Sequence, residues 1–450
     1  MIKIVSCDNT TLPAEVEDLR KKLSVTEGIV SSKSSALTER VFGEPLTPPQ
    51  VVDRIISDVR NKGDEAVRHY ARELDGAEFK EGRFESDPSL RDKAFELVDK
   101  ELIEALEAAA ANIVEYQSHI LYKGAPPLEK DGVIRGIKVT PMERVGIYIP
   151  GGIGGETPLC SSVLMTACLA RTAGVKEIVM CTPSRKDGSL SPALLAAAKI
   201  AGVDRIFKIG GVHAVAAMAL GTESVPRVDK IVGPGNLFVT MAKQKLYGHV
   251  DIDFFAGPSE IGILADKTAN PANVAMDLFS QAEHFPGSAI LMTDSMELAN
   301  RVNEELDRLL PSLSRSQEIG EAIDRYSLII VTPTMDRAIE LSNIFCPEHL
   351  EIVTADVQET LKGIRNAGAI FLGSETPVAS GDYFAGPSHV LPTGGTSRFF
   401  SGLTSNDFIK TSSLIQYSKE GLAKAQKHIN VLAGSEGLTA HAESVNIRLK

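Results

Sequence analysis

The sequence predicts an α/β protein with two Rossmann-like units, each a parallel sheet flanked by helices. From residue 144 onward, short apolar runs alternate with runs of helical periodicity, which is the pattern of successive strand–helix–strand units. The first apolar run, VGIYI at 145–149, ends directly in a Pro-Gly-Gly loop, as a buried strand does before a turn. Neither unit contains GxGxxG or the GxxxxGKS/T phosphate loop.

The two predicted units follow each other along the chain and divide near Gly257. In the first set, the expected strands are 145–149, 177–181, 205–209, 230–232 and 260–264, with helices at 192–200, 214–220 and 238–246. The second set follows a helix at 271–284, with strands at 289–293, 328–332, 350–353 and 369–372 and helices at 296–310, 335–344 and 357–365. No sequence repeat links the two sets.

The flanking segments complete the predicted domain organisation. Residues 1–46 are weakly periodic, and we expect an N-terminal arm there. Helical patterns then begin at Thr47 and include a long helix at 101–117. We assign 47–143 and 258–403 to a first, discontinuous α/β domain, 144–257 to a second α/β domain, and 404–450 to a helical C-terminal tail.

Composition favours a soluble cytoplasmic protein. Lys and Arg number 47 against 59 Asp and Glu, a net charge of −12, which opposes a general role in binding nucleic acid or anionic membranes. The five cysteines are scattered and odd in number, as in a reduced chain rather than a disulfide framework. No apolar stretch is long enough to span a bilayer, and the N-terminus lacks the pattern of a signal peptide.

The helix at 271–284 ends in a pair of possible metal ligands. Gln281 and His284 are three residues apart and therefore project from the same side of the last turn. Imidazole suits zinc and an oxygen ligand can join it, although two ligands do not make a site. A histidine that simply favours the helix dipole at a C-terminus is the other interpretation.

Further candidates lie in loops and at strand ends. Glycine loops after predicted strands, Gly210-Gly211 and 233–236 among them, could let backbone N–H groups approach a phosphate, although strand-to-helix turns need glycine anyway. Glu348 and His349 precede the strand at 350–353 and could act as acid and base; a plain polar turn is the alternative. The long Gly-, Ser- and Pro-rich segment after 372, with Asp382 and His389, has the character of a functional loop.

Eight short motifs, taken together, resemble the histidinol dehydrogenase family. They keep the family's order from about residue 50 to the C-terminus, and each is weak alone. They are RVGIYIPGG (144–152), VDKIVGPGN (228–236), AGPSEI (256–261), SQAEH (280–284), PEHLE (347–351), GDY (381–383), HVLP (389–392) and LTAH (438–441).

The resemblance implies a zinc- and NAD-dependent oxidation of L-histidinol to L-histidine in two hydride transfers, through a bound aldehyde. It also implies an intertwined homodimer with shared active sites and one zinc ion per subunit. The implied zinc ligands are Gln281, His284, Asp382 and His441, the last supplied by the partner subunit in this family. A tail that reaches the partner fits this arrangement.

The resemblance also implies roles for the remaining candidates. His349 matches the base that takes the alcohol proton, and Glu348 matches the group that activates water for the second oxidation. Tyr148 and Asn236 match NAD contacts. Residues matching substrate contacts, directly or through the zinc ion, are Ser259, Gln281, His284, His349, Asp382, His389, Glu436 and His441.

Two features depart from the family pattern. His213 stands where most members have a glutamine that contacts NAD, so we do not transfer that contact. The loop at 151–158 is about three residues longer than usual and adds Glu156. These departures leave open a paralogous zinc- and NAD-dependent dehydrogenase that oxidises another small alcohol, such as a dihydroxypropane sulfonate, to the acid. A third possibility is a non-catalytic, zinc-stabilised dimer, which the intact Glu348 and His349 oppose.

Overall fold

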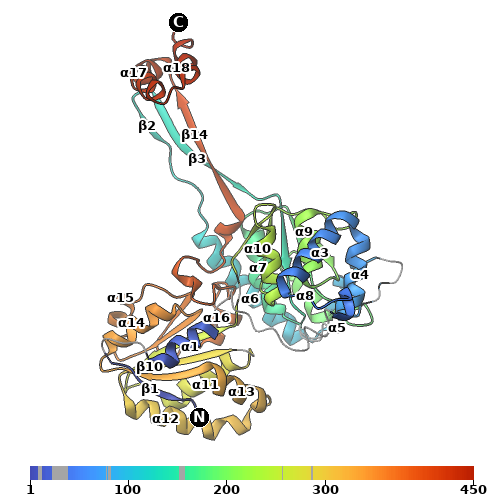
Figure 1. Ribbon diagram of the computed structural model, residues 1–450, viewed down its shortest axis with the longest axis vertical. Helices are drawn as coiled ribbons and strands as arrows, with labels where there is room; N and C mark the ends of the chain where they lie inside the picture. Colours follow the sequence, from blue (N-terminus) through green and yellow to red (C-terminus); the bar gives the residue numbers. More distant parts are fainter. Residues whose placement is uncertain are drawn as a thin grey trace.

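Two parallel sheets and one long antiparallel arm organise the chain (Figure 1). The computed structural model describes residues 1–8, 13–22, 39–77, 79, 83–151, 158–255, 257–284 and 287–450. Glu156 with most of the 151–158 loop, Pro286 after the 271–284 helix, Ala256 and part of the expected N-terminal arm lie outside these residues. The predicted α/β class with parallel sheets is confirmed.

The first sheet is a doubly wound, five-stranded parallel sheet in the order β6-β5-β4-β7-β8. Its strand order reverses between β4 and β7, which makes the carboxyl ends of these two strands the switch point where ligands bind in open α/β sheets. The strands are β4 (Arg144–Tyr148), β5 (Glu177–Cys181), β6 (Arg205–Phe207), β7 (Lys230–Val232) and β8 (Asp251–Ile252).

Helices cover both faces of this sheet. One core cluster contains buried side chains of α5 (Ser89–Leu97), α6 (Lys100–Ile120), α7 (Cys160–Thr172) and α8 (Pro192–Ile200). The opposite cluster contains those of α3 (Pro48–Lys62), α4 (Asp64–Asp75), α9 (Gly211–Leu220) and α10 (Leu237–Leu246). The sequence pattern assigns 47–143 to the same domain as 258–403, whereas the buried contacts group α3 to α6 with the sheet of 144–257. An amphipathic helix reveals its apolar face in the sequence, not the sheet that this face covers.

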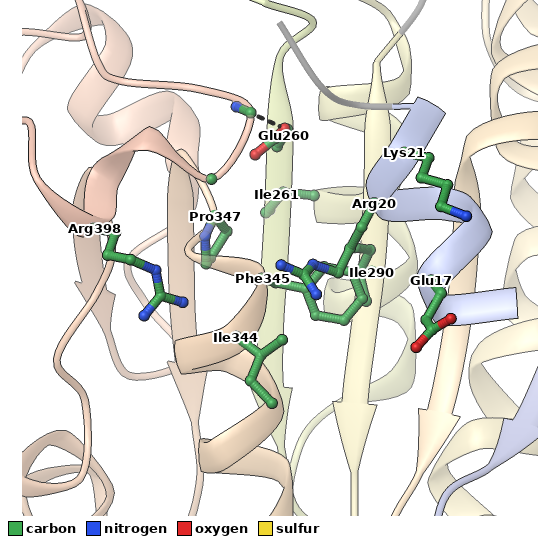
Figure 2. Close-up of a pocket in the computed structure, with 12 residues that line it drawn as sticks. Glu17, Arg20, Lys21, Glu260, Ile261, Ile290, Ile344, Phe345, Pro347 and Arg398 are labelled. Atoms are coloured by element: carbon green, nitrogen blue, oxygen red, sulfur yellow. Dashed lines mark hydrogen bonds between the residues drawn. The ribbon is translucent and has the colours of Figure 1, made fainter. Parts of the chain in front are cut away.

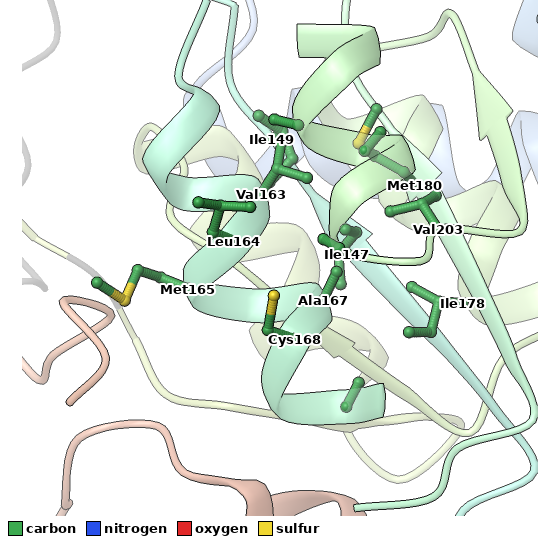
Figure 3. Close-up of a cluster of buried hydrophobic side chains, with 14 of the residues drawn as sticks. Ile147, Ile149, Val163, Leu164, Met165, Ala167, Cys168, Ile178, Met180 and Val203 are labelled. Carbon is green, nitrogen blue, oxygen red and sulfur yellow. The ribbon is translucent and has the colours of Figure 1, made fainter. Parts of the chain in front are cut away.

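The helix α7 was not predicted, although it lies at the centre of this unit. Its sequence is apolar almost all round, with nine consecutive buried residues from Ser162 to Ala170. A helix buried on every side shows no helical periodicity. Figure 3 shows Val163, Leu164 and Ala167 of α7 packed with Ile147 of β4 and neighbouring side chains.

The second sheet is parallel and six-stranded, in the order β1-β11-β10-β9-β12-β13. If β1 is left aside, the other five strands of this sheet lie in the same spatial order, relative to their order along the chain, as the five strands of the first sheet. Its strands are β1 (Ile4–Ser6), β9 (Glu260–Ala265), β10 (Ser288–Thr293), β11 (Ser327–Val331), β12 (His349–Val353) and β13 (Ala369–Leu372). One face is covered by α11 (Pro271–Ala282), α12 (Met296–Leu309) and α13 (Ser316–Tyr326), and the other by α1 (Ala14–Lys22), α14 (Met335–Phe345) and α15 (Val357–Lys362).

The N-terminal segment is integrated into this sheet rather than being only an arm. Strand β1 pairs in parallel with β11, with Val5 opposite Ile330, and Val16 of α1 is fully buried in the adjoining core. Three strand residues carry too little pattern to be recognised without their partner strand.

A short link joins the two sheets edge to edge. Strand β8 ends at Ile252 and β9 begins at Glu260, so residues 253–259 lead from the carboxyl edge of the first sheet to the amino edge of the second. The amino ends of β9 and β12 therefore lie on the side of the molecule that faces the first unit.

The C-terminal segment forms an arm that projects away from both sheets (Figure 1). Strand β14 (Ile409–Tyr417) pairs antiparallel with β3 (Val133–Pro141), which also pairs with β2 (Leu128–Lys130). The arm ends in α17 (Lys419–Ser435) and α18 (Thr439–Asn446). We expected 404–450 to be mostly helical; the helices are confirmed, but β14 was missed because its polar and apolar residues do not alternate regularly.

Within the described residues, no helix is both long and apolar enough to cross a membrane.

The packing between β4 and α7 predicts a large effect of core truncation. Ile147 is fully buried, so Ile147→Ala should reduce the free energy of unfolding by about 2–5 kcal/mol through lost burial and a cavity. Urea unfolding followed by circular dichroism measures this change. The control Leu97→Ala, at a side chain that is 72% exposed, should change stability by less than about 0.5 kcal/mol; equal effects of the two variants would contradict the assigned packing.

Candidate active site

A buried acid–base pair lies at the amino edge of the six-stranded sheet, at the switch point between β9 and β12. His349 is the first residue of β12 and lies opposite Ile261 of β9. Glu348 and His349 are both buried. Glu348 Oε2 accepts a hydrogen bond from the Glu260 N–H at 2.9 Å and lies 3.6 Å from His349 Nδ1. The two neighbouring residues of the predicted pair are therefore close in space as well as in sequence.

The surroundings of His349 define which ring nitrogen is available. Nδ1 lies 3.2 Å from the Glu260 carbonyl oxygen, and a carbonyl oxygen can only accept, so Nδ1 carries the proton in this contact. Nε2 faces the Asp382 carboxylate, with Oδ1 at 3.4 Å, and this interaction raises the pKa of His349 and lowers that of Asp382. Nε2 is therefore the nitrogen directed towards the site.

Glu348 and His349 have different pKa values, because their electrostatic surroundings act on them differently. Burial raises the pKa of Glu348 to about 7, although the nearby His349 opposes this shift. Burial acts to lower the pKa of His349, but the Glu348 and Asp382 carboxylates outweigh it and raise that pKa to about 9. Glu348 thus changes charge near neutral pH, which is where a general base is most effective.

Two candidate metal ligands, His284 and Asp382, interact with His349 of this pair, and Gln281 lies three residues before His284. Gln281 and His284 lie at the end of α11, and Asp382 lies in α16 (Val378–Tyr383), whose start is held by a 3.0 Å hydrogen bond from the Val378 N–H to Glu351. Burial opposes ionisation of Asp382, yet the adjacent His349 keeps its pKa below the usual value, and the charge of His284 acts in the same direction. The Asp382 carboxylate is therefore ionised and adjoins His284.

The donor set fits zinc but is incomplete in one chain. Gln281 is 2% exposed, and its amide forms no side-chain hydrogen bond with other described residues. Desolvation by surrounding atoms lowers the pKa of the partly exposed His284, which favours the neutral imidazole that metals bind. One imidazole, one carboxylate and one amide oxygen suit a zinc ion that needs a fourth ligand. Among the described residues, no group of three His, Cys, Asp or Glu is placed to hold a metal ion.

Two further predicted residues adjoin the same site. His389 Nδ1 lies 2.9 Å from the Asp382 carbonyl oxygen, and its Nε2 lies 3.3 Å from Ser162 Oγ of α7. The Ser259 side chain adjoins Glu348 and acts to lower its pKa. Because Ser162 belongs to the first unit and Asp382 to the second, the site lies between the two units.

Glu436 and His441 are not near this site in their own chain. Glu436 ends α17 and His441 lies in α18, at the far end of the arm (Figure 1).

The predicted cofactor contacts lie at the switch point of the first sheet. Tyr148 ends β4; it is buried, and its hydroxyl accepts a hydrogen bond from the Gly211 N–H at 3.1 Å. Asn236 caps α10 by accepting hydrogen bonds from the Phe238 and Val239 N–H groups. Its side-chain NH2 group remains available to a ligand.

The glycine loops do not offer the free phosphate cradle that their sequences allow. The N–H groups of Gly210 and Gly211 donate to Asp75 and Tyr148, and the Gly233 N–H donates to Asp253 at 2.8 Å. These glycines therefore form strand-to-helix turns, which is the alternative to phosphate binding that the sequence leaves open. His213 is fully buried and lies 3.3 Å from Asp75, so it packs within the protein.

Glu260 is the residue of this site that the sequence did not single out. It is 5% exposed and its main chain contacts both Glu348 and His349. The available signal was a charged residue at the start of an otherwise apolar strand, a position that is seldom buried without a partner.

The fold and the site together define an α/β enzyme with an acid–base centre between two doubly wound sheets. The sequence model for histidinol dehydrogenase matches residues 47–449. A histidinol dehydrogenase from Bacillus cereus (strain ATCC 10987 / NRS 248) is 45% identical over 435 residues, covering 96% of this chain and 98% of the relative. One from Clostridium acetobutylicum is 45% identical over 416 residues, covering 92% and 95%.

A solved structure agrees with these sequence matches. The crystal structure of histidinol dehydrogenase from Elizabethkingia anophelis superposes with a TM-score of 0.89 at 33% identity, covering 100% of this chain and 98% of that one. This chain belongs to the histidinol dehydrogenase family.

The loop after β7 contains a glycine that we predict cannot be replaced by a residue with a side chain. Gly233 has φ +118°, and a Cβ atom there would overlap the Tyr148 carbonyl oxygen. Gly233→Ala should therefore lower the free energy of unfolding by more than about 2 kcal/mol. Gly320→Ala, within α13 and with only ordinary contact to Leu310, should instead gain about 0.5–1 kcal/mol. Thermal unfolding compares the two, and a neutral Gly233→Ala would contradict the tight turn.

Proposed function

We propose that this protein is a zinc-dependent histidinol dehydrogenase that oxidises L-histidinol to L-histidine with two molecules of NAD. The overall reaction consumes one water, transfers four electrons and yields two NADH. The observation that carries this proposal is the buried Glu348–His349 pair beside Asp382, within a chain of this family.

The proposed chemistry divides between the two members of the pair. His349 takes the alcohol proton as hydride leaves the carbinol carbon in the first oxidation. This role needs the neutral imidazole, and zinc on Asp382 would favour it by offsetting the carboxylate charge that raises the pKa of His349 to about 9. Glu348 then removes a proton from water, which attacks the bound aldehyde before the second hydride transfer. The pKa of Glu348 at about 7 supports a base that is largely ionised at slightly alkaline pH.

Zinc would be held by Gln281, His284 and Asp382 of one chain and by His441 of the partner subunit. When bound, the ion fixes the substrate and polarises the group that coordinates it. Ser259, His389 and the partner's Glu436 would complete substrate binding. The ionised Asp382 carboxylate and the electrostatic interaction between Asp382 and His284 support this assignment.

NAD would lie at the carboxyl edge of the first sheet, near Tyr148 and Asn236. This edge adjoins the amino edge that carries Glu348 and His349, because Ser162 near the start of α7 lies 3.3 Å from His389 Nε2, and His389 Nδ1 contacts the Asp382 carbonyl oxygen. The nicotinamide and the carbinol carbon can therefore meet between the two units, which is the geometric requirement of hydride transfer.

A homodimer would bring the two halves of each site together. The arm exposes large apolar side chains, including Ile415 and Leu432 at 69% and 64%, and such exposure marks an interaction surface. A partner subunit that receives this arm would cover them and would place His441 beside Asp382. A cytoplasmic location accords with five scattered cysteines that form no disulfide.

The other two hypotheses are less well supported. The similar curated proteins are histidinol dehydrogenases over nearly their whole length, which favours histidinol over a dihydroxypropane sulfonate. The intact acid–base pair opposes a purely structural zinc dimer.

The stoichiometry of NADH formation tests the proposed reaction. With zinc present, one L-histidinol should yield two NADH, measured by absorbance at 340 nm, because both oxidations occur before release. Dihydroxypropane sulfonate serves as the competing substrate. Turnover of the sulfonate alone would reject the histidinol assignment, and turnover of neither would leave only the structural dimer.

Subunit complementation tests the shared site. His349→Ala homodimers should retain zinc and lose turnover, whereas His441→Ala homodimers should lose both, because only the second change removes a ligand. Co-expression of the two variants in equal amounts forms about half heterodimers by random pairing, each with one intact site made of His349 from one chain and His441 from the other.

The mixed sample should therefore recover about a quarter of wild-type activity, since half of the dimers have one of two sites. Mixing the two purified homodimers without exchange is the control and should remain inactive. No recovery after co-expression, with heterodimers verified by differential tags, would contradict a His441 supplied by the partner.

A further inference from the structure

Glu260 uses its main chain to hold both members of the acid–base pair. Its N–H donates to Glu348 Oε2 at 2.9 Å, and its carbonyl oxygen accepts from His349 Nδ1 at 3.2 Å. The position of this one residue at the start of β9 therefore sets the orientation of the Glu348 carboxylate relative to the His349 ring.

The Glu260 side chain fixes that position from the other side of the strand. Its Oε1 accepts a hydrogen bond from the Gly394 N–H at 2.9 Å, drawn as the dashed line in Figure 2. Nearby, the Gly257 N–H donates to Thr393 Oγ1 at 2.5 Å. The segment that leads into β9 is thus attached at two points to the loop that follows His389.

The buried surroundings of the Glu260 carboxyl group are unfavourable for its ionised form. It lines a cavity of about 530 Å³ together with Arg20, Lys21 and Arg398, yet no lysine or arginine of the described residues forms an ion pair with it. Burial and the neighbouring Glu348 raise its pKa to about 8. A buried carboxyl without a cation destabilises a fold, so folding stability alone does not account for a glutamate here.

We propose that Glu260 is a positioning residue for the oxidation: its carboxyl group, anchored on Gly394, holds the peptide that orients Glu348 and His349. The inference rests on the proposed function for its kinetic consequence, but the placement of Glu348 can be examined independently of turnover.

The test compares Glu260→Ala with Glu260→Gln. The amide of glutamine has nearly the same volume and an oxygen that can accept from Gly394, whereas alanine removes the anchor. Glu260→Ala should lower kcat by about 10- to 100-fold, the cost of a misplacement of about 1 Å, and Glu260→Gln should recover most of that loss. Zinc content and thermal unfolding, measured for both, establish that the comparison is made on folded, loaded protein.

A double mutant separates positioning from a general structural effect. In the Glu348→Ala background, Glu260→Ala should reduce the residual rate by a clearly smaller factor than in wild-type enzyme, because only the contact of the Glu260 carbonyl oxygen with His349 is then left to disturb. Loss of the same factor in both backgrounds would overturn the proposal, as would a Glu260→Ala enzyme with wild-type kcat.

Crystal structures of the two variants give a readout that does not depend on activity. The Glu348 carboxylate should leave the residue-260 N–H in Glu260→Ala and keep this contact in Glu260→Gln. An unchanged Glu348 in Glu260→Ala would overturn the inference even if wild-type enzyme oxidises histidinol. If wild-type enzyme fails to oxidise histidinol, the proposed function is rejected, while these structures still decide the role of Glu260 in placing Glu348.

Discussion

The parallel pairing of β9 with β12 is the constraint on which the site depends. His349 lies opposite Ile261, and the Glu260 peptide contacts both members of the acid–base pair. A slip of one residue would turn every side chain of β12 to the opposite face, and would place His349 and Glu351 in the apolar core that Leu350 and Ile352 occupy. Burial of these apolar side chains therefore fixes the register, and the register fixes where the chemistry occurs.

The two sheets present opposite edges to each other, which explains why the site departs from the usual location. Open α/β sheets bind ligands beyond the carboxyl ends of their strands, and the first sheet presents Tyr148 at that edge. The second sheet contributes its amino edge. Since helices run antiparallel to the strands they follow, the C-terminal end of α11 lies at this edge, and Gln281 and His284 accompany the acid–base pair.

The C-terminal arm carries the candidate site residues that we assign to the active site of the partner subunit. Within a chain, Gln281, His284 and Asp382 supply fewer donors than zinc requires, and Glu436 and His441 lie at the far end of the arm. In the dimer that we propose, the energy gained by covering the exposed apolar side chains of the arm also completes the metal site. Assembly and metal binding would then be coupled, because neither subunit holds a complete donor set.

The sequence by itself determined the α/β class, most strands and helices of both sheets, and the Glu348–His349 pair as a candidate acid and base, because these are local patterns or contiguous motifs. It did not predict α7, α13 or β8, and it placed the strand at 260–264, which is β9 of the second sheet, in the first set. Only the tertiary structure decided that α3 to α6 cover the first sheet, that β1 joins the second, and that the glycine N–H groups already have partners. It alone revealed Glu260 and the strand β14. Their roles depend on contacts between residues far apart in the chain, such as Glu260 with Gly394, and periodicity does not encode such contacts.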